Sequence, residues 1–501
     1  MPADWNAIEQ LPATKLTDLF AADAGRLASL SLDVAGIHFD WSKTHLTRDA
    51  ITAFEALAKA QDLSGKREAL FAGKVINTTE GRSVTHVAER GEGDAEDVAK
   101  AQALHARMRA LIDAIEAEAL GPIEHILHVG IGGSALGPDL LVDALGRESG
   151  RYDVAIVSNV DGAALEEVFA KFDPTATLLV IASKTFTTKE TMLNAESVLQ
   201  WMAEAGVEDT YGRVVALTAD PDKAIEWGVD ETRILPFAES VGGRYSLWSS
   251  IGFPAALALG WDEFAELLEG AAEMDRHFKL TALSENAPAL AAFADLYYAQ
   301  VRHCETRATF AYDERLRLLP SYLQQLEMES NGKGTTIDGQ KLDRPSAPIT
   351  WGGVGTDAQH AVFQLLHQGT HLVPVEFVAV IEPGATLSED HHRQLLINAF
   401  AQGAALMAGR PNDDLARSYS GDRPSSTILL DTLDARTLGA RIAFYEQRTL
   451  VSGVLLGINS FDQFGVELGK EMAKAADASS KNGGGQDFDV STNDLIKRAF
   501  G

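Results

Sequence analysis

The stretch MESNGKG, residues 328–334, places Glu329 beside a serine, an asparagine and two glycines. Apolar residues at mixed three- and four-residue spacing precede it and predict a helix, while Asn331 and Gly332 predict where that helix ends. We therefore expect Glu329 in the last turn, at the negative end of the helix dipole, where anions are disfavoured. A surface glutamate would be poorly placed there, whereas a general base that must take up a proton would be well placed.

Two further polar side chains could assist such a base. Gln325 precedes Glu329 by four residues and shares its helix face, so it could orient the carboxylate or hold a water, although a solvated face is the alternative. Arg244 follows two glycines in GGRYSLWSSIG, residues 242–252. Arginine is permanently charged and can brace an oxyanion. On this stretch alone, a surface arginine in a turn is equally compatible.

Hydroxyl groups gather in ASKTFTTKET, residues 182–191, just past the apolar run TLLVI. Loops that follow strands in open α/β sheets bind ligands, and hydroxyls, backbone N–H groups and a helix start can together hold a phosphate. A single such residue could simply cap the next helix, but five hydroxyls favour a phosphate site. The loop carries five hydroxyl and two ammonium groups: Ser183, Thr185, Thr187, Thr188, Thr191, Lys184 and Lys189.

Glycines in HVGIGGSALG, residues 128–137, stand between a predicted strand and a predicted helix, where backbone N–H groups can approach an anion. Gly130, Gly132 and Ala135 also satisfy the loose fingerprint of dinucleotide-binding folds, and Asp161 could mimic the ribose-binding acid. A dinucleotide-dependent dehydrogenase is therefore one alternative, but it leaves the hydroxyl-rich loop and MESNGKG unexplained.

A candidate proton-transfer histidine lies in GTDAQHAVFQLLHQGT, residues 355–370. Thr356 or Asp357 is the predicted N-cap of a helix that ends at Gly369, which would put His360 in the first turn. The positive helix end disfavours imidazolium, so we expect a neutral His360 that can exchange a proton near pH 7. A structural histidine remains an equal alternative, and because no H-E-x-x-H pattern or cysteine partner accompanies it, no metal site is predicted.

The last motif is INSFDQFGVELGKEM, residues 458–472. Ser460 and Gln463 match a capping box, and Lys470 lies seven residues after Gln463 on the same predicted helix face. Taken alone, Lys470 is most simply a solvated lysine.

Apolar runs between the motifs predict the elements that must position them. HILHVG, DVAIVSN, TLLVIAS, GRVVALTA and TRILPF alternate with helical segments, and PITWGG and HLVPVEFVAVIEPG suggest a second unit of the same kind. This alternation predicts an α/β fold of parallel sheets covered by helices. Residues 1–120 and about 255–330 have helical spacing instead.

Composition limits the partners and the compartment. The chain has 501 residues, too many for one core, and a formal net charge of -29, which would repel nucleic acid and anionic membranes. An anionic substrate would need local Lys, Arg and backbone N–H groups. Cys304 is the only cysteine, which fits a reducing compartment. With neither a signal-peptide pattern nor an apolar run of about 20 residues, we expect a cytoplasmic protein.

Taken together, GIGGS, SKTFTT, GGRYSLWS, MESNGK, QHAVFQLLHQGT and GINSFDQFGVELGK resemble the glucose-6-phosphate isomerase family in residue type, order and rough spacing. The resemblance runs from about residue 40 to the C-terminus. It implies two sugar-isomerase (SIS) domains with helical terminal arms, a homodimer and no cofactor. It also implies that glucose 6-phosphate and fructose 6-phosphate are interconverted, in glycolysis and gluconeogenesis, by ring opening and a cis-enediolate.

The resemblance implies residue roles as well. Glu329 would move a proton between C1 and C2 of the sugar, and Arg244 would steady the enediolate. His360 and Lys470 would open the ring, with His360 reaching the active site from the partner subunit. The positions that would contact the substrate are Gly133, Ser134, Ser183, Lys184, Thr185, Thr188, Gln325 and Gln463. Proton transfer on one carboxylate requires no metal, nucleotide or redox cofactor.

We expect four parts in the chain: a helical region over 1–120, a first α/β domain with the sugar-phosphate loop over 121–290, a second with the catalytic Glu and His over 291–477, and a tail over 478–501. The tail would open with a loop or linker, ASSKNGGGQD. A non-catalytic sugar-phosphate sensor is a second alternative. It would need the phosphate loop but not Glu329, His360 and Lys470 together, so their joint presence favours an enzyme.

Overall fold

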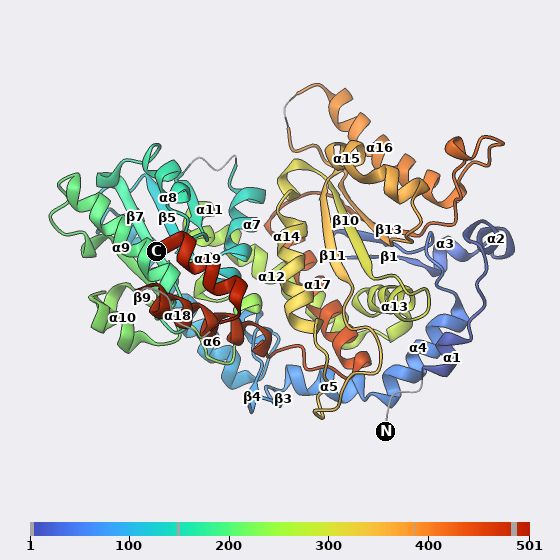
Figure 1. The fold of residues 1–501 in the computed structure, drawn as a ribbon, viewed down its shortest axis with the longest axis horizontal. Coiled ribbons are helices and arrows are strands. Elements are labelled where there is room, and N and C mark those ends of the chain that lie inside the picture. The colour runs from blue at the N-terminus through green and yellow to red at the C-terminus, as the bar shows by residue number, and fades with distance from the viewer. Residues whose placement is uncertain (1–4, 148–150, 386, 482–487, 501) are drawn as a thin grey trace. The chain divides into compact units, whose positions relative to one another are not determined.

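A computed structural model describes residues 5–147, 151–385, 387–481 and 488–500. The chain divides into two compact units, Met1–Ser460 and Phe461–Gly501. The first unit contains the β-sheets and the helices that cover them (Figure 1). The second contains α18 (Glu467–Lys481) and α19 (Val490–Phe500). The predicted α/β class, with parallel sheets flanked by helices, is confirmed.

The first sheet has the strand order β6-β5-β7-β8-β9, and each neighbouring pair is parallel. All of its strands were predicted from apolar runs: β5 (His125–Gly130), β6 (Asp153–Val157), β7 (Thr177–Ala182), β8 (Val214–Thr218) and β9 (Ile234–Pro236). The register pairs Gly130 with Ala182, so the glycine-rich turn after β5 and the hydroxyl-rich loop after β7 leave the same edge of the sheet.

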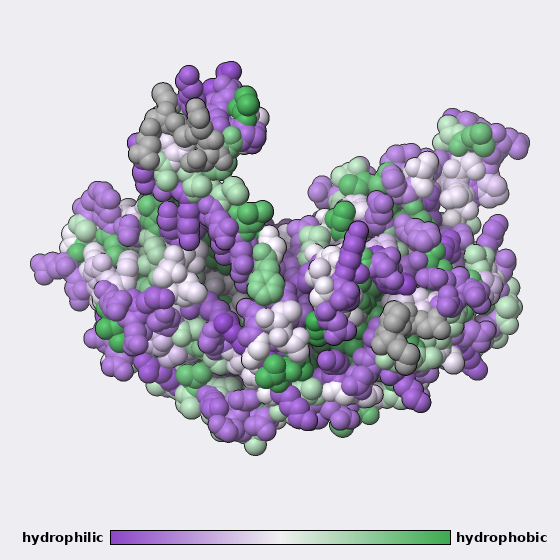
Figure 2. Space-filling model, turned by 60° about the horizontal axis from the view of Figure 1, so that its bottom comes forward, coloured by the Kyte–Doolittle hydropathy of each residue, from purple (hydrophilic) through white to green (hydrophobic). Residues whose placement is uncertain are grey.

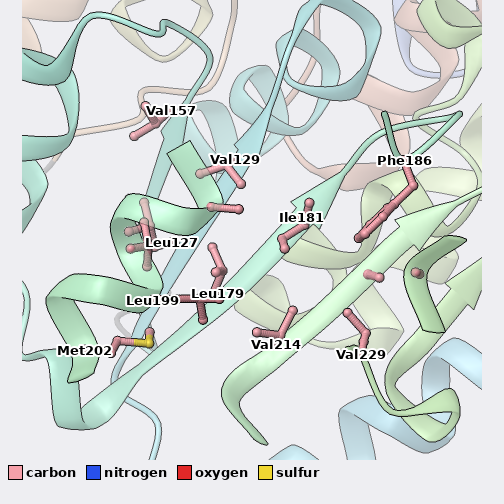
Figure 3. Close-up of a cluster of buried hydrophobic side chains, with 14 of the residues drawn as sticks. Leu127, Val129, Val157, Leu179, Ile181, Phe186, Leu199, Met202, Val214 and Val229 are labelled. Atoms are coloured by element: carbon pink, nitrogen blue, oxygen red, sulfur yellow. The ribbon is translucent and has the colours of Figure 1, made fainter. Parts of the chain in front are cut away.

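One face of this sheet builds a hydrophobic core with α8 (Gly162–Phe169) and α9 (Lys189–Glu204). Figure 3 shows Leu127 and Val129 from β5 and Leu179 and Ile181 from β7 among its members. These side chains lie two residues apart in each strand because alternate residues of a strand point to the same face. Further helices contact the sheet: α6 (Ala95–Glu116), α7 (Leu136–Leu145), α10 (Pro221–Trp227) and α11 (Phe253–Leu259).

The second sheet has the order β1-β2-β13-β12-β10-β11. Its members are β1 (Ser31–Val34), β2 (Ile37–Asp40), β13 (Ser425–Leu430), β12 (Val375–Val380), β10 (Thr306–Tyr312) and β11 (Ile349–Val354). The last four run parallel, whereas the β1–β2 hairpin joins β13 in antiparallel register. Helices α14 (Leu319–Leu323), α15 (Gly355–Gln368) and α16 (Glu389–Ala408) contact these strands.

The sequence-based description of the helical segments was wrong in two places. β10 lies inside the stretch near 255–330 that was expected to be helical, and β1 and β2 lie inside the N-terminal segment expected to be helical. Short strands of mixed composition carry too few alternating positions to outweigh the helical spacing around them. A further prediction, the linker over 478–487, is wrong at 478–481, which continue α18. Its remainder, 482–487, lies outside the described residues.

A buried helix, α17 (Ala435–Leu456), packs on α12 (Trp261–Leu280) and α13 (Ala287–Gln300). Glycines let α12 and α17 approach closely: a Cβ on Gly270 would lie 1.8 Å from the carbonyl oxygen of Arg436, and one on Gly439 would lie 2.0 Å from that of Leu267. The N-terminal residues add short elements: α1 (Asn6–Glu9), α2 (Leu16–Ala22), α3 (Arg26–Ser29), α4 (Arg48–Ala60), α5 (Leu63–Phe71), β3 (Val75–Asn77) and β4 (Arg82–Ser83).

The face seen in Figure 2 is mostly hydrophilic, with hydrophobic side chains in small separate patches. None of the helices in the described part of the chain is both long and apolar enough to cross a bilayer.

Candidate active site

The helix that carries Glu329 changes its winding before it ends. After α14 the chain forms a π-helical turn, Gln324–Glu329, followed by helical Ser330 and Asn331. The predicted helix end is confirmed, because Gly332 leaves the helix while its N–H still donates to the Met328 carbonyl at 2.8 Å. The mixed three- and four-residue spacing did not reveal the π turn, a feature frequent at functional sites.

The Glu329 carboxylate faces protein groups and not bulk water. Its Oε2 accepts a hydrogen bond from Gln325 Nε2 at 2.8 Å, and its Oε1 lies 3.3 Å from Arg244 Nη1. The Glu329 side chain is 19% exposed and that of Arg244 only 2%. The structure thus brings Glu329 and Gln325 from one motif together with Arg244 from another, and it rules out the solvated helix face for Gln325 and the surface turn for Arg244.

Arg244 is fixed in orientation by its other nitrogens. Nε donates to Ser330 Oγ at 2.6 Å, Nη2 donates to the Ser460 carbonyl at 2.5 Å, and the guanidinium lies 5.3 Å from the ring centroid of Tyr245. The Tyr245 hydroxyl is in turn 2.8 Å from Ser330 Oγ. No role was predicted for Ser330 or Tyr245 from the sequence, although Ser330 follows Glu329 and Tyr245 follows Arg244 directly.

The glycine-rich turn after β5 packs on the turn that carries Arg244. A Cβ on Gly133 would lie 2.2 Å from the carbonyl carbon of Gly243, so no larger residue fits between these backbones. Gly132 has a φ of +60°, and a Cβ there would lie 2.9 Å from Gln325 Nε2. The carbonyl of Ser134 accepts from His128 Nε2 at 2.7 Å, which fixes the turn to the buried strand. Gly133 and Ser134 therefore border the same site as Gln325.

The hydroxyl-rich loop is ordered by its own side chains. Ser183 Oγ lies 3.0 Å from Thr188 Oγ1, and Thr185 Oγ1 lies 2.8 Å from Thr187 Oγ1. Thr188 occupies the N-cap position of α9, yet its side chain does not cap the helix. The simple capping explanation for these hydroxyls is therefore wrong, and the loop presents them at the N-terminus of α9, where anions are favoured.

A strained residue anchors this loop. Phe186 has a φ of 51°, which non-glycine residues seldom adopt, while its ring is buried in the first sheet's core. Lys184 braces the loop from the other side, because its Nζ donates to the carbonyls of Glu239 at 2.7 Å and Val241 at 3.2 Å. Burial lowers the pKa of Lys184, with Arg82 adding to the effect.

His360 lies on α15 with an exposed side chain. Two local predictions around it were wrong: the helix begins at Gly355, its N-cap is Val354 and not Thr356 or Asp357, and His360 consequently lies beyond the first turn. The predicted end at Gly369 is confirmed. Within the described part of the chain, His360 makes no hydrogen bond or ion pair, so no such contact joins it to Glu329.

Gln463 and Lys470 belong to the second unit, where both are exposed and Lys470 lies on α18. The predicted capping box is wrong: α18 begins at Glu467, and the Ser460 hydroxyl, in the first unit, donates to Asn331 Oδ1 at 2.6 Å.

The dinucleotide alternative loses its acidic residue, because Asp161 caps α8 by accepting from the Ala163 N–H at 3.1 Å. Among the described residues there is no group of three or more His, Cys, Asp or Glu side chains arranged to hold a metal ion.

The fold is shared with a solved glucose-6-phosphate isomerase from Chlamydia trachomatis, with a TM-score of 0.88, 30% identity and coverage of 97% of this chain and 96% of that one. The fold is that of a sugar-phosphate isomerase. Residues 40–496 match the model of the phosphoglucose isomerase family, and the chain belongs to that family. The family interconverts glucose 6-phosphate and fructose 6-phosphate, as the resemblance implied.

Curated relatives agree over full length. A glucose-6-phosphate isomerase from Rhizorhabdus wittichii is 69% identical, with 100% of this chain and 99% of the relative covered. Another from Zymomonas mobilis is 64% identical, with 99% and 98% covered.

Proposed function

We propose that this chain interconverts glucose 6-phosphate and fructose 6-phosphate at the site around Glu329, through ring opening and a cis-enediolate. The observation that carries the proposal is the Glu329 carboxylate, held by Gln325 and lying 3.3 Å from the fixed guanidinium of Arg244. Glu329 takes the proton from C2 of the open aldose and returns it to C1. The electron pair left behind forms the enediolate, whose negative oxygen Arg244 stabilises.

The phosphate of the substrate is held by the loop after β7. Ser183, Thr185 and Thr188 offer hydroxyls at the N-terminus of α9, and Ser134 and the backbone at Gly133 offer donors from the neighbouring turn. Lys184 contributes by bracing the loop through backbone carbonyls and by adding positive charge. Binding energy from this remote group positions the reacting carbons against Glu329.

Ring opening is assigned to His360 and Lys470, and Gln463 joins Gln325 as a substrate contact. His360 acts in the site of a second copy of the chain, in a homodimer. Two features support this: its imidazole is exposed on α15, and apolar side chains of α15 and α16 are also exposed, among them Leu365, Ile397 and Phe400. A cytoplasmic location completes the proposal and is supported by the single, buried cysteine, Cys304.

A coupled assay that converts fructose 6-phosphate to glucose 6-phosphate tests the base assignment. We expect Glu329→Gln to lower kcat by about three orders of magnitude, because the amide keeps the hydrogen bond to Gln325 but cannot take up a proton. Substrate binding should change little, and the exposed control Glu208→Gln should behave as wild type.

Normal turnover by Glu329→Gln would show that another group is the base. Wild-type protein that binds the sugar phosphate without turning it over would instead favour the sensor. Reduction of a dye that depends on added NAD would favour the dehydrogenase.

A further inference from the structure

A second carboxylate lies in the same π turn as Glu329 and points the other way. Glu327 is buried, and its side chain accepts hydrogen bonds from Arg307 Nη2, Arg448 Nη2 and Thr350 Oγ1, the last at 2.9 Å. No role was predicted for Glu327 from the sequence, and the proposed reaction does not use it.

The charge of Glu327 is compensated inside the protein. Burial alone would raise the pKa of this carboxyl, but Arg307 and Arg448 together lower it to about 2. Glu327 is therefore ionised at neutral pH. Removing its charge would take one carboxylate partner away from each of the buried guanidinium groups of Arg307 and Arg448, which destabilises the fold in a low-dielectric interior.

The three donors come from three different elements. Arg307 belongs to β10, Thr350 to β11 and Arg448 to α17. Glu327 therefore ties the π turn to two neighbouring strands of the second sheet and to the buried helix beside them. On the other side of the same turn, Glu329 meets Arg244, which comes from the turn after the first sheet.

The π winding explains how both carboxylates find partners. A π turn closes hydrogen bonds from residue i to i+5, so it holds one residue more than an α turn, and its side chains point in directions that an α turn would not give them. If the segment relaxed to α-helix while Glu327 stayed in place, the direction of the Glu329 side chain relative to Arg244 would change.

We propose that Glu327 is a positioning residue for Glu329: by fixing the π turn to Arg307, Arg448 and Thr350, it sets the direction of the carboxylate that faces Arg244. This inference rests on the proposed role of Glu329 as the base. Glu327 itself touches no reacting atom.

The buried network contains a matched control. Glu376 on β12 accepts from Arg448 Nη1 at 2.7 Å and from the Tyr445 hydroxyl at 2.8 Å, and it is also buried. It shares Arg448 with Glu327 but lies outside the π turn. Glu376→Gln therefore removes a carboxylate charge from the same network without touching the segment that carries Glu329.

The test compares steady-state kinetics and thermal unfolding of the full chain for Glu327→Gln, Glu376→Gln and wild type. We expect both variants to unfold at lower temperature. At 25 °C, Glu327→Gln should lose 10- to 100-fold in kcat with KM within about twofold of wild type, because a misdirected base slows proton transfer more than binding. Glu376→Gln should keep kcat within about twofold.

Thr350→Val provides a milder second variant, because it removes one hydrogen bond to Glu327 without leaving a charge unpaired. We expect its kcat to fall severalfold at unchanged KM. If Glu327→Gln does not fold, the kcat of Thr350→Val tests the positioning role of Glu327. The proposal is overturned if the folded variants of Glu327 and Thr350 keep wild-type kcat, or if Glu376→Gln loses as much kcat as Glu327→Gln. Full activity of Glu329→Gln, measured in parallel, would instead show that the proposed base is wrong.

Discussion

Arg244 makes a different contact with each of its guanidinium nitrogens. Nε binds a serine hydroxyl, Nη2 a backbone carbonyl, and Nη1 faces the Glu329 carboxylate. Lysine cannot make these contacts together, because its single ammonium group lies at the end of a flexible side chain, whereas the guanidinium group is planar and carries several donors in fixed directions. The cation opposite Glu329 is thus held before substrate arrives, as electrostatic stabilisation of an enediolate requires.

We therefore expect Arg244→Lys to lower kcat by about 100- to 1000-fold, since preorganised charge at an oxyanion is worth about that much. The coupled isomerase assay gives this value directly. Arg417→Lys, on an exposed arginine, is the control and should be indistinguishable from wild type. If kcat of Arg244→Lys fell by tenfold or less, a positive charge without the guanidinium geometry would be sufficient to stabilise the enediolate.

At the scale of elements, the buried His128 of β5, which bonds the glycine-rich turn, makes the stability of the protein depend on pH. This histidine is completely buried, and burial lowers its pKa to about 4. The pKa of histidine in an unfolded chain is about 6.5, so between pH 6.5 and 4 this histidine binds a proton in the unfolded chain but not in the folded one. The stabilisation from neutral His128 is present above pH 6.5 and is lost as the pH falls from 6.5 towards 4.

His128→Gln should remove this dependence, because glutamine can keep the hydrogen bond to the Ser134 carbonyl but does not titrate. Between pH 7 and pH 5, we expect the free energy of unfolding of the wild type to fall by about 2 kcal/mol relative to that of the variant. This follows from a change of about 1.36 kcal/mol for each pH unit below 6.5. Urea unfolding of both proteins at the two pH values measures the difference. Parallel pH dependence in wild type and variant would contradict the assignment.

The same scale shows what the sequence could and could not predict. The strands of the first sheet were predictable because each is an apolar run, and the central strands β5, β7 and β8 are buried on both faces. β10 and the β1–β2 hairpin were not, because they are short strands of mixed composition, and the distant partners of β10 and β2, namely β12 and β13, give no local signal. The π turn was missed for a similar reason: it is held by Arg307, Thr350 and Arg448, and nothing within Gln324–Glu329 indicates those contacts.

Among the site residues, local chemistry was informative where a motif was self-contained, as for Glu329 and Gln325, which are bonded as predicted. The contact between Glu329 and Arg244 depends on tertiary structure and could only be inferred from resemblance. The N-cap before His360 was misplaced because the helix starts directly from β11, with no polar residue between them.

At the scale of the whole molecule, the proposed dimer makes a quantitative prediction. If His360 acts in the partner's site, Glu329→Gln and His360→Asn are each nearly inactive as homodimers. A mixed dimer has one site with both variants and one site with neither. Random reassociation of equal amounts should make about half of the dimers mixed. Because each mixed dimer has one working site of two, the mixture should recover about 25% of wild-type activity.

The experiment denatures and refolds the two variants together and assays the mixture. Variants refolded separately and then combined without exchange serve as the control. If the mixture stays as inactive as its components, His360 serves the site of its own subunit.

The antiparallel pairing of β2 with β13 also bears on how the protein is made. Nearby, His45 Nε2 lies 3.0 Å from Asp422 Oδ1, and the two residues are 377 positions apart. A ribosome adding 5–20 residues per second needs about 20–75 s to span that interval, and throughout it the β2 edge has nothing to pair with. Nascent chains therefore carry an open strand for most of their synthesis, and translation that stops short of β13 leaves it permanently unprotected. Because an unpaired strand edge can pair with another chain, the nascent protein is prone to aggregation until the late strand emerges.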